Sequence, residues 1–351
     1  VLPLYGMSEG GIKAVALLTF FGLIACLFRW SGVHSAAILS LSPAFIFSIG
    51  RGYEEVYLAA FCGLSFVLFT GILSSKNRIL QHIGGGWAFM LMPYAKGFTD
   101  ATGVLVGGLL LAVTVLLWRE VHLRGGEKTR WMSKPHIVGI AVCSFVSLSM
   151  VLLGILGYNS TLAILADSPV RYTTAFAFSL FDVVILFTLF GMVAWPFVQP
   201  MFASLASIED SNIALMTGYI VGMMTAIVFY VAALWTYEAS IWDADWPGII
   251  WTMGNNGRYI TMLFIPLVFL LKHSSQHVEV PTYDSPGSKV AVMGMTLLLL
   301  LPLSLLASVH GQTMWTDEAA DSMSLSDEEH FLFVSEAVSY THLTLPTILL
   351  V

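Results

Sequence analysis

Hydrophobic runs follow one another along nearly the whole chain, and they constrain its fold more than any other feature. Crossing the hydrocarbon core of a bilayer takes about 20 apolar residues in a helix. About ten runs of this length, or somewhat less, can be traced in the 351 residues. Because the backbone of a lipid-exposed segment must satisfy its own hydrogen bonds, such runs form helices. We therefore expect an all-α fold, a polytopic transmembrane helical bundle.

Two of the runs are too short or too rich in glycine to be ordinary straight spans, namely 35–49 and 83–93. Irregular backbone at membrane depth is tolerated only beside protein or an aqueous cavity. These two segments therefore predict a cavity on the outer side, near Arg51 and Lys96. The other expected spans are 12–28, 56–73, 102–118, 136–157, 173–197, 212–235, 258–271 and 290–308.

The basic residues predict the orientation of the chain. Successive segments between the spans belong alternately to the two sides of the membrane. Of the fifteen Lys and Arg residues, ten fall in the segments of one side and five in those of the other side. The positive-inside rule places the richer set in the cytoplasm. We therefore expect an integral, multi-pass membrane protein, located in the plasma membrane if the source is prokaryotic. The five basic residues expected outside are Lys13, Arg51, Lys96, Arg171 and Arg258.

Composition excludes several other classes of protein. With 57% hydrophobic and 11% charged residues, a soluble domain of this length is implausible. The formal net charge of −7 is not the signature of a nucleic-acid-binding protein. The three cysteines lie far apart within apolar runs, so they predict neither a disulfide framework nor a metal cluster.

We expect three regions along the chain. Residues 1–310 are the transmembrane domain, and residues 311–337 are an acidic outer tail or linker. The stretch from Ser339 to Thr347 resembles the translation of a sequencing adapter, so 338–351 is interpreted as an artefact and carries no functional argument.

Ionisable residues of the outer face gather at the junctions between spans. Arg51, Glu54 and Glu55 lie between the short segment 35–49 and the next span. One interpretation is that both acids lie in the first turn of a helix, where the helix dipole favours carboxylates. The other is that the two carboxylates and the arginine line a polar site that acts on a metal ion or on sugar hydroxyls.

Two further basic residues are candidates for binding an anion. Lys96 follows the glycine-rich segment, and Arg258 opens the span 258–271. A lysine at this depth can simply extend its ammonium group to the interface. Alternatively, Lys96 and Arg258 bind a lipid-linked phosphate, the arginine through two parallel hydrogen bonds and the lysine as a compact charge.

Acidic residues supply two further candidates. Asp243 and Asp245 form a D-x-D between Trp242 and Trp246, and two acids at this spacing can share a divalent cation such as Mg²⁺ or Mn²⁺. The alternative is an interfacial loop anchored by its tryptophans. Asp182 lies near the middle of a span, where a charge is costly, and is either functional or protonated and bonded within its helix.

Short motifs occur in a fixed order along the chain. They are Pro3-Leu4-Tyr5-Gly6-Met7-Ser8-Glu9 followed by Lys13, then Arg29, Ala36-Ala37 and Leu41-Ser42-Pro43, then Arg51 with Glu54-Glu55, and finally Arg258-Tyr259 with Pro266. In this order the chain resembles the GT-C superfamily of integral membrane glycosyltransferases, over about residues 1–100 and 250–271. The likeness is to the group that contains protein O-mannosyltransferases and the aminoarabinose transferase of lipid A.

The resemblance implies a reaction and its partners. Such enzymes transfer a sugar from a polyprenyl- or dolichyl-phosphate donor to a protein, lipid or glycan acceptor on the outer face. It implies Glu54 and Glu55 as catalytic acids, and Arg51, Lys96, Arg258 and Tyr259 as ligands of the donor phosphate. The family's first span and first acidic loop have no counterpart here, so the principal base is expected to lie outside this chain. Many relatives also carry Asp where this chain has Glu54-Glu55.

Two other functions remain open at this point. A transporter or flippase for a lipid-linked or anionic solute predicts charges near the midplane, which Asp182 supplies, and internal symmetry, which is not evident. A non-catalytic subunit of a membrane complex predicts that substitutions at Glu54, Lys96 or Arg258 leave the products of the pathway unchanged.

Overall fold

The computed structural model describes residues 9–50, 53–72, 77–124, 161–181, 211–241, 254–274 and 286–310. Helices make up nearly all of these residues, and no strand occurs among them. The predicted all-α class is thereby confirmed for this part of the chain. The chain divides into two compact units, Val1–Tyr57 with Met293–Val351, and Leu58–Val292, which we describe separately.

The first unit contains α1 (Glu9–Ser31), α2 (Val33–Ser40), α3 (Pro43–Gly50) and most of α13 (Pro286–His310). α1 packs against α2 and α3, with Phe20 and Phe45 in ring contact at 5.7 Å between centroids. The unit therefore has its own apolar core.

The expected short span 35–49 is a broken helix. α2 ends at Ser40 and α3 begins at Pro43, because proline disfavours the α conformation of the residue before it and has no N–H to continue the helix. The carbonyl of Leu41, at the break, accepts a hydrogen bond from the hydroxyl of Ser304 in α13. The prediction that this segment is not a straight span is confirmed.

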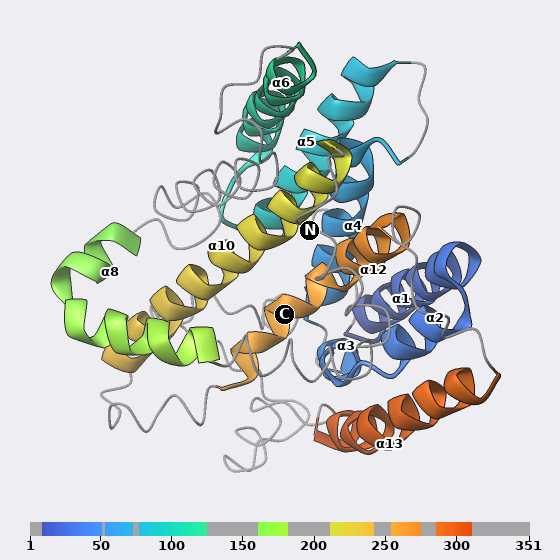
Figure 1. Cartoon of the computed structure of the whole chain (residues 1–351). Helices are drawn as coiled ribbons and strands as arrows, with labels where there is room; N and C mark the ends of the chain where they lie inside the picture. Colours follow the sequence, from blue (N-terminus) through green and yellow to red (C-terminus); the bar gives the residue numbers. More distant parts are fainter. Residues whose placement is uncertain are drawn as a thin grey trace. The chain divides into compact units, whose positions relative to one another are not determined.

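The second unit contains most of α4 (Glu55–Thr70) and all of α5 (Arg78–Ala95), α6 (Ala101–Arg124), α8 (Thr161–Asp167), α10 (Ser211–Ile241), the 3₁₀ helix η2 (Gly254–Leu263) and α12 (Phe264–Ser274). Residues 169–181 are also helical. α10 contacts α6, α8, α12 and η2, and its residues 213–220 are all buried (Figure 1). α10 is therefore the central helix of this unit.

α5 and α6 form a tightly packed helix pair (Figure 1). The side chain of Asn77 caps the start of α5 by accepting from the Leu80 N–H at 3.2 Å, and Asp100 accepts from the Gly103 N–H at 2.7 Å at the start of α6. A Cβ atom on Gly86 would overlap the backbone carbonyl of Gly108, so the two backbones are nearly in contact.

This packing explains why the expectation for 83–93 differs from the structure. We expected this segment, which is short and rich in glycine, not to be an ordinary straight span. α5 is instead one continuous helix of 18 residues, and its glycines let α6 approach closely. The cost in helix propensity is offset by the packing of the pair.

Three helices in the described ranges are long and apolar enough to cross a membrane: Lys13–Ser31, Ala101–Arg119 and Asn212–Thr236. These bounds lie close to the expected spans 12–28, 102–118 and 212–235. Shorter apolar helices, at Glu55–Thr70, Tyr259–Leu270 and Met293–Leu305, coincide with three more of the expected spans. The expected span 136–157 and most of 173–197 lie outside the described residues.

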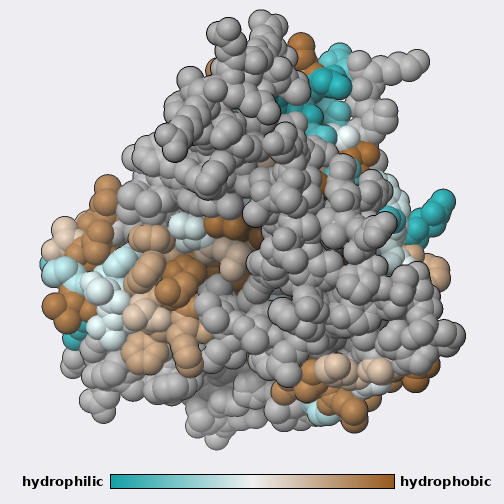
Figure 2. All heavy atoms as spheres, in the orientation of Figure 1, coloured by the Kyte–Doolittle hydropathy of each residue, from teal (hydrophilic) through white to brown (hydrophobic). Residues whose placement is uncertain are grey.

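The three long helices differ in how much protein surrounds them. The apolar stretch of α10 is 72% buried, whereas that of α6 is 11% and that of α1 is 17% buried. Large apolar side chains are also exposed along α13 and along residues 161–181, where Figure 2 shows hydrophobic surface. They include Leu162, Val170, Phe181, Val290, Leu298 and Leu305.

Candidate anion-binding pocket

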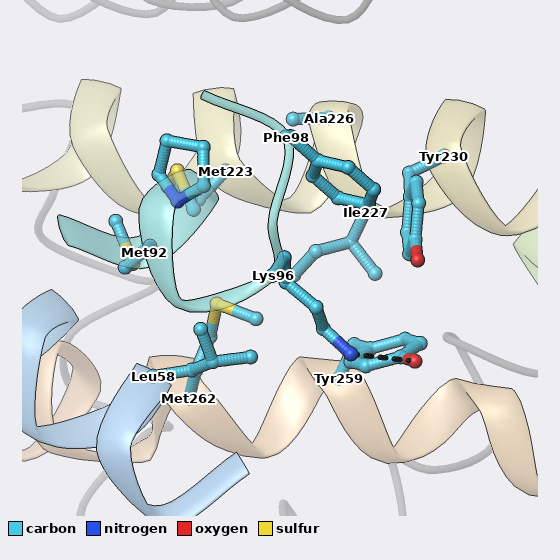
Figure 3. Close-up of a pocket in the computed structure, with 11 residues that line it drawn as sticks. Leu58, Met92, Lys96, Phe98, Met223, Ala226, Ile227, Tyr230, Tyr259 and Met262 are labelled. Atoms are coloured by element: carbon cyan, nitrogen blue, oxygen red, sulfur yellow. Dashed lines mark hydrogen bonds between the residues drawn. The ribbon is translucent and has the colours of Figure 1, made fainter. Parts of the chain in front are cut away.

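A pocket in the second unit lies between α4, the end of α5, α10 and η2 (Figure 3). Its cavity volume is about 60 Å³, roughly the space of two water molecules. Apolar groups dominate the lining, and the polar atoms are the ammonium group of Lys96 and the hydroxyls of two tyrosines. The lining residues are Leu58, Met92, Pro93, Lys96, Phe98, Met223, Ala226, Ile227, Tyr230, Tyr259 and Met262.

The end of α5 places Lys96 at the pocket. The N–H of Gly97 donates to the carbonyl of Tyr94 at 3.0 Å, and the N–H of Phe98 donates to that of Pro93 at 2.8 Å. These two bonds form a Schellman motif, which needs the residue after the cap in the left-handed region. Gly97 follows the cap residue and adopts this left-handed conformation, with φ of 76°. Lys96 is therefore held at a fixed cap position, with Phe98 folded back beside Pro93 in the pocket wall.

The 3₁₀ helix η2 places Tyr259 and Met262 on the same face. Side chains three residues apart eclipse one another in a 3₁₀ helix, so both residues point into the pocket. η2 runs for 10 residues, whereas 3₁₀ runs beyond about 3–4 residues are uncommon.

Lys96 and Tyr259 are in direct contact. The ammonium nitrogen of Lys96 donates a hydrogen bond to the Tyr259 hydroxyl at 3.1 Å and lies 4.5 Å from the centroid of that ring. A cation over an aromatic face is attracted by the quadrupole of the ring. Tyr259 itself is only 4% exposed. The contact therefore fixes a positive charge at the polar end of an otherwise apolar pocket.

Sequence reasoning missed Tyr230 and Phe98. Tyr230 packs edge-on against Tyr259 at 5.4 Å and against Phe98 at 5.9 Å between ring centroids. The signal that was available is the stripe of Met223, Ile227 and Tyr230 on α10, whose spacing puts them on one helix face. Within an apolar span, this stripe could not be distinguished from ordinary core residues.

A second polar cluster, which we call the Arg119 junction, joins four helices of the same unit. The Arg119 guanidinium donates to the carbonyl of Phe69 at 3.3 Å, to His82 Nε2 at 3.2 Å and to Asn212 Oδ1 at 2.9 Å. His82 Nδ1 donates to the carbonyl of Arg78 at 2.7 Å. Because a carbonyl only accepts, Nδ1 carries the proton and Nε2 is the acceptor for Arg119.

His82 is 1% exposed, so the neutral imidazole is the form that suits the junction. We interpret this cluster as structural, because it joins the end of α4 to α5, α6 and α10.

The structure brings together only some of the predicted site residues. Lys96 and Tyr259 meet in the pocket. The expected cavity on the outer side near Arg51 and Lys96 stays a prediction, because Arg51 lies outside the described residues. Arg258 lies in η2, but its side chain is outside the described residues, as are Arg51, Asp182, Asp243 and Asp245. The predicted metal site at Asp243 and Asp245 therefore stays a prediction.

Glu54 and Glu55 lie where the sequence predicted, at the start of a helix. Glu55 is the first residue of α4 and Glu54 forms the turn before it. Glu55 is 2% exposed, and Glu54 is half-buried. Both belong to the first unit, whereas Lys96 and Tyr259 belong to the second. Within the described ranges, no group of three or more His, Cys, Asp or Glu residues gathers in a metal-binding arrangement.

Comparisons with protein-family models, with curated proteins and with solved structures found no match for this chain.

Proposed function

We propose that this chain belongs to a membrane glycosyltransferase, built as a bundle of about ten spans, that transfers a sugar from a polyprenyl- or dolichyl-phosphate donor to an acceptor on the outer face. The observation that carries the proposal is the pocket at Lys96. It combines one fixed cation and the Tyr259 hydroxyl with a wall of Leu58, Met92, Met223 and Met262.

The chemistry of the pocket suits an anionic lipid. Figure 3 shows the Lys96 nitrogen beside the Tyr259 oxygen on one side of the pocket, with the methionines and Leu58 beyond them. A lysine supplies a compact charge and hydrogen-bond donors for a phosphate, while thioether and aliphatic groups adapt to an apolar chain. A cavity of about 60 Å³ is smaller than a phosphate with its first isoprenyl unit, so binding requires Lys96 or the methionines to move.

The largely exposed apolar surfaces of α1 and α6 support the membrane location. The expected ten-to-five distribution of basic residues places Lys96 on the outer side. A donor with a long isoprenyl tail would then reach the pocket from the bilayer, and its sugar would face an acceptor outside the cell.

The proposed reaction is a displacement at the anomeric carbon. The acceptor oxygen forms a bond to that carbon as the bond to the phosphate oxygen breaks, the acceptor proton passes to a carboxylate, and the lipid phosphate leaves with the electron pair. Lys96 and the Tyr259 hydroxyl stabilise the charge that develops on the leaving phosphate. Arg51 and Arg258 are proposed to share this role, and Glu54 and Glu55 to serve as catalytic carboxylates. A divalent cation at Asp243 and Asp245 is part of the same proposal.

The test uses membranes that contain the protein expressed from its complete gene, supplied with a panel of radiolabelled polyprenyl-phosphate sugars. We expect label in an acceptor, and we expect it to disappear in the combined variant Glu54→Gln with Glu55→Gln. The combined variant Lys96→Ala with Arg258→Ala should reach the membrane in normal amounts yet lose the use of the donor.

Two results would count against the proposal. Normal transfer by the Lys96 and Arg258 variant would remove the phosphate assignment. No transfer from any donor, with labelled lipid instead moving across the bilayer, would replace the transferase with a flippase.

A further inference from the structure

Four side chains of the pocket are linked in series by three contacts, and we call this group the aromatic circuit: Lys96, Tyr259, Tyr230 and Phe98. The Lys96 ammonium lies on Tyr259, Tyr259 meets the Tyr230 ring at an interplanar angle of 67°, and Tyr230 meets the Phe98 ring at 64°. Phe98 is two residues from Lys96 in the same helix cap, so the series returns to its start. Three elements, α5, η2 and α10, are joined through it.

Tyr230 is the member of the circuit that comes from α10, the central helix of the unit. It makes both ring-to-ring contacts, and such pairs are most favourable in edge-to-face arrangements of this kind. Without its ring, Tyr259 would lose the neighbour that packs against its edge. The Lys96 ammonium lies over the face of Tyr259, so a change in the orientation of that ring moves the charge.

We propose that Tyr230 is a positioning residue, which fixes the Lys96 ammonium for an anionic lipid phosphate by holding the Tyr259 ring. This inference rests on the proposed function only in treating Lys96 as the ligand of the donor phosphate. The ring of Tyr230, not its hydroxyl, carries the effect.

Three variants separate this role from general damage to the fold. Tyr230→Leu removes the ring, and Tyr230→Phe removes only the hydroxyl. Phe229→Leu is the matched control, because Phe229 is the adjacent residue of α10 and packs on Phe176 at 4.9 Å, in a pair outside the pocket. It deletes a ring of similar size from the same helix.

The first measurement is the rate at which an amine-specific reagent modifies Lys96 in the purified protein, followed by mass spectrometry with Lys13 as the internal reference. Losing an aromatic contact is worth up to about tenfold in a conformational equilibrium. We expect Tyr230→Leu to raise the Lys96 rate by up to about tenfold, whereas Tyr230→Phe and Phe229→Leu stay at the wild-type rate.

The second measurement uses farnesyl phosphate as a probe that protects Lys96 from the reagent. Tyr230→Leu should need about tenfold more probe for half-protection, and Tyr230→Phe should restore the wild-type value. In the transfer assay, Tyr230→Leu should raise the KM for the donor and lower kcat, because Lys96 contacts the phosphate both in the bound donor and in the transition state.

The outcomes distinguish this inference from the proposed function. If farnesyl phosphate does not protect Lys96 in the wild-type protein, the phosphate assignment is wrong, and the comparison of modification rates still tests Tyr230. The inference is overturned if Tyr230→Leu leaves the Lys96 rate unchanged. It is also overturned if Tyr230→Phe behaves like Tyr230→Leu, or if Phe229→Leu produces the same effect.

Discussion

At the scale of single residues, the Arg119 junction shows how one guanidinium can join several helices. The carbonyl of Phe69 belongs to the last turn of α4, His82 belongs to α5, and Asn212 to the first turn of α10. Arginine suits this position because its donors are arranged in a rigid planar fork. Gly71, with φ of 71°, ends α4 next to the guanidinium.

Arg119→Lys tests this interpretation. Lysine keeps the charge but cannot present donors in three fixed directions, so at least one buried acceptor loses its partner. We expect a loss of about 1–3 kcal/mol in the free energy of unfolding, measured by denaturation in detergent. Arg78→Lys, at an exposed position, is the control and should change stability little. If the two substitutions changed the free energy of unfolding equally, the junction would contribute no more to stability than an exposed charge does.

At the scale of elements, the pair of α5 and α6 depends on the absence of side chains at its contact. A methyl group at Gly86 would overlap the Gly108 carbonyl, whereas one at Gly22 in α1 would meet no atom within 4 Å. The same substitution should therefore have opposite consequences at the two sites.

Gly86→Ala is expected to lower the free energy of unfolding by about 1–3 kcal/mol, because the helices must separate. Gly22→Ala is expected to raise it by about 0.5–1 kcal/mol, because alanine has less backbone entropy to lose. Melting temperatures of the two variants provide the comparison. A stabilised Gly86→Ala would contradict the close contact of α5 and α6.

The elements also show what a sequence can and cannot predict here. Helix positions followed from hydropathy, so α6 begins within a residue of the expected span and α4 begins at Glu55. The glycines of α5 were misinterpreted, because the same residues lower helix propensity in isolation and permit close packing beside a partner. Propensity is a local property, and the partner was not visible from the sequence.

The residues of the pocket could also be predicted from the sequence only in part. Lys96 and Tyr259 were found because their motifs lie at the ends of spans. Tyr230 and Phe98 acquire their significance from contacts with Tyr259 and with each other, across 29 and 132 positions of the chain. Pairing between residues so far apart depends on tertiary packing, which spacing and composition do not reveal.

At the scale of the whole molecule, the alternation of basic residues is the feature that most needs an experiment. The ten-to-five distribution predicts that the segment between α4 and α5 lies inside and the segment between α5 and α6 outside. This prediction requires α5 to cross the membrane, although it has only 18 residues and contains polar Gln81 and His82.

Single cysteines test this topology in a background without the native ones. Ala101→Cys, at the exposed start of α6, should react with a membrane-impermeant maleimide in intact cells. Ser75→Cys, in the basic segment before α5, should react only after lysis. Labelling of both positions from the same side would mean that α5 does not cross.

Besides its contact with Tyr259, Lys96 interacts electrostatically with the helix that it caps. As the C-cap of α5 it lies at the carbonyl end of the helix, where the partial negative charge of the helix dipole favours a cation. Most protein sites for phosphate use the opposite end, where free amide groups and a positive potential attract the anion. An anion that reaches Lys96 must therefore share the ammonium with the helix and overcome the repulsion of its carbonyl groups. Its affinity should rest on direct ionic contact, fall with rising ionic strength and gain little from the peptide backbone.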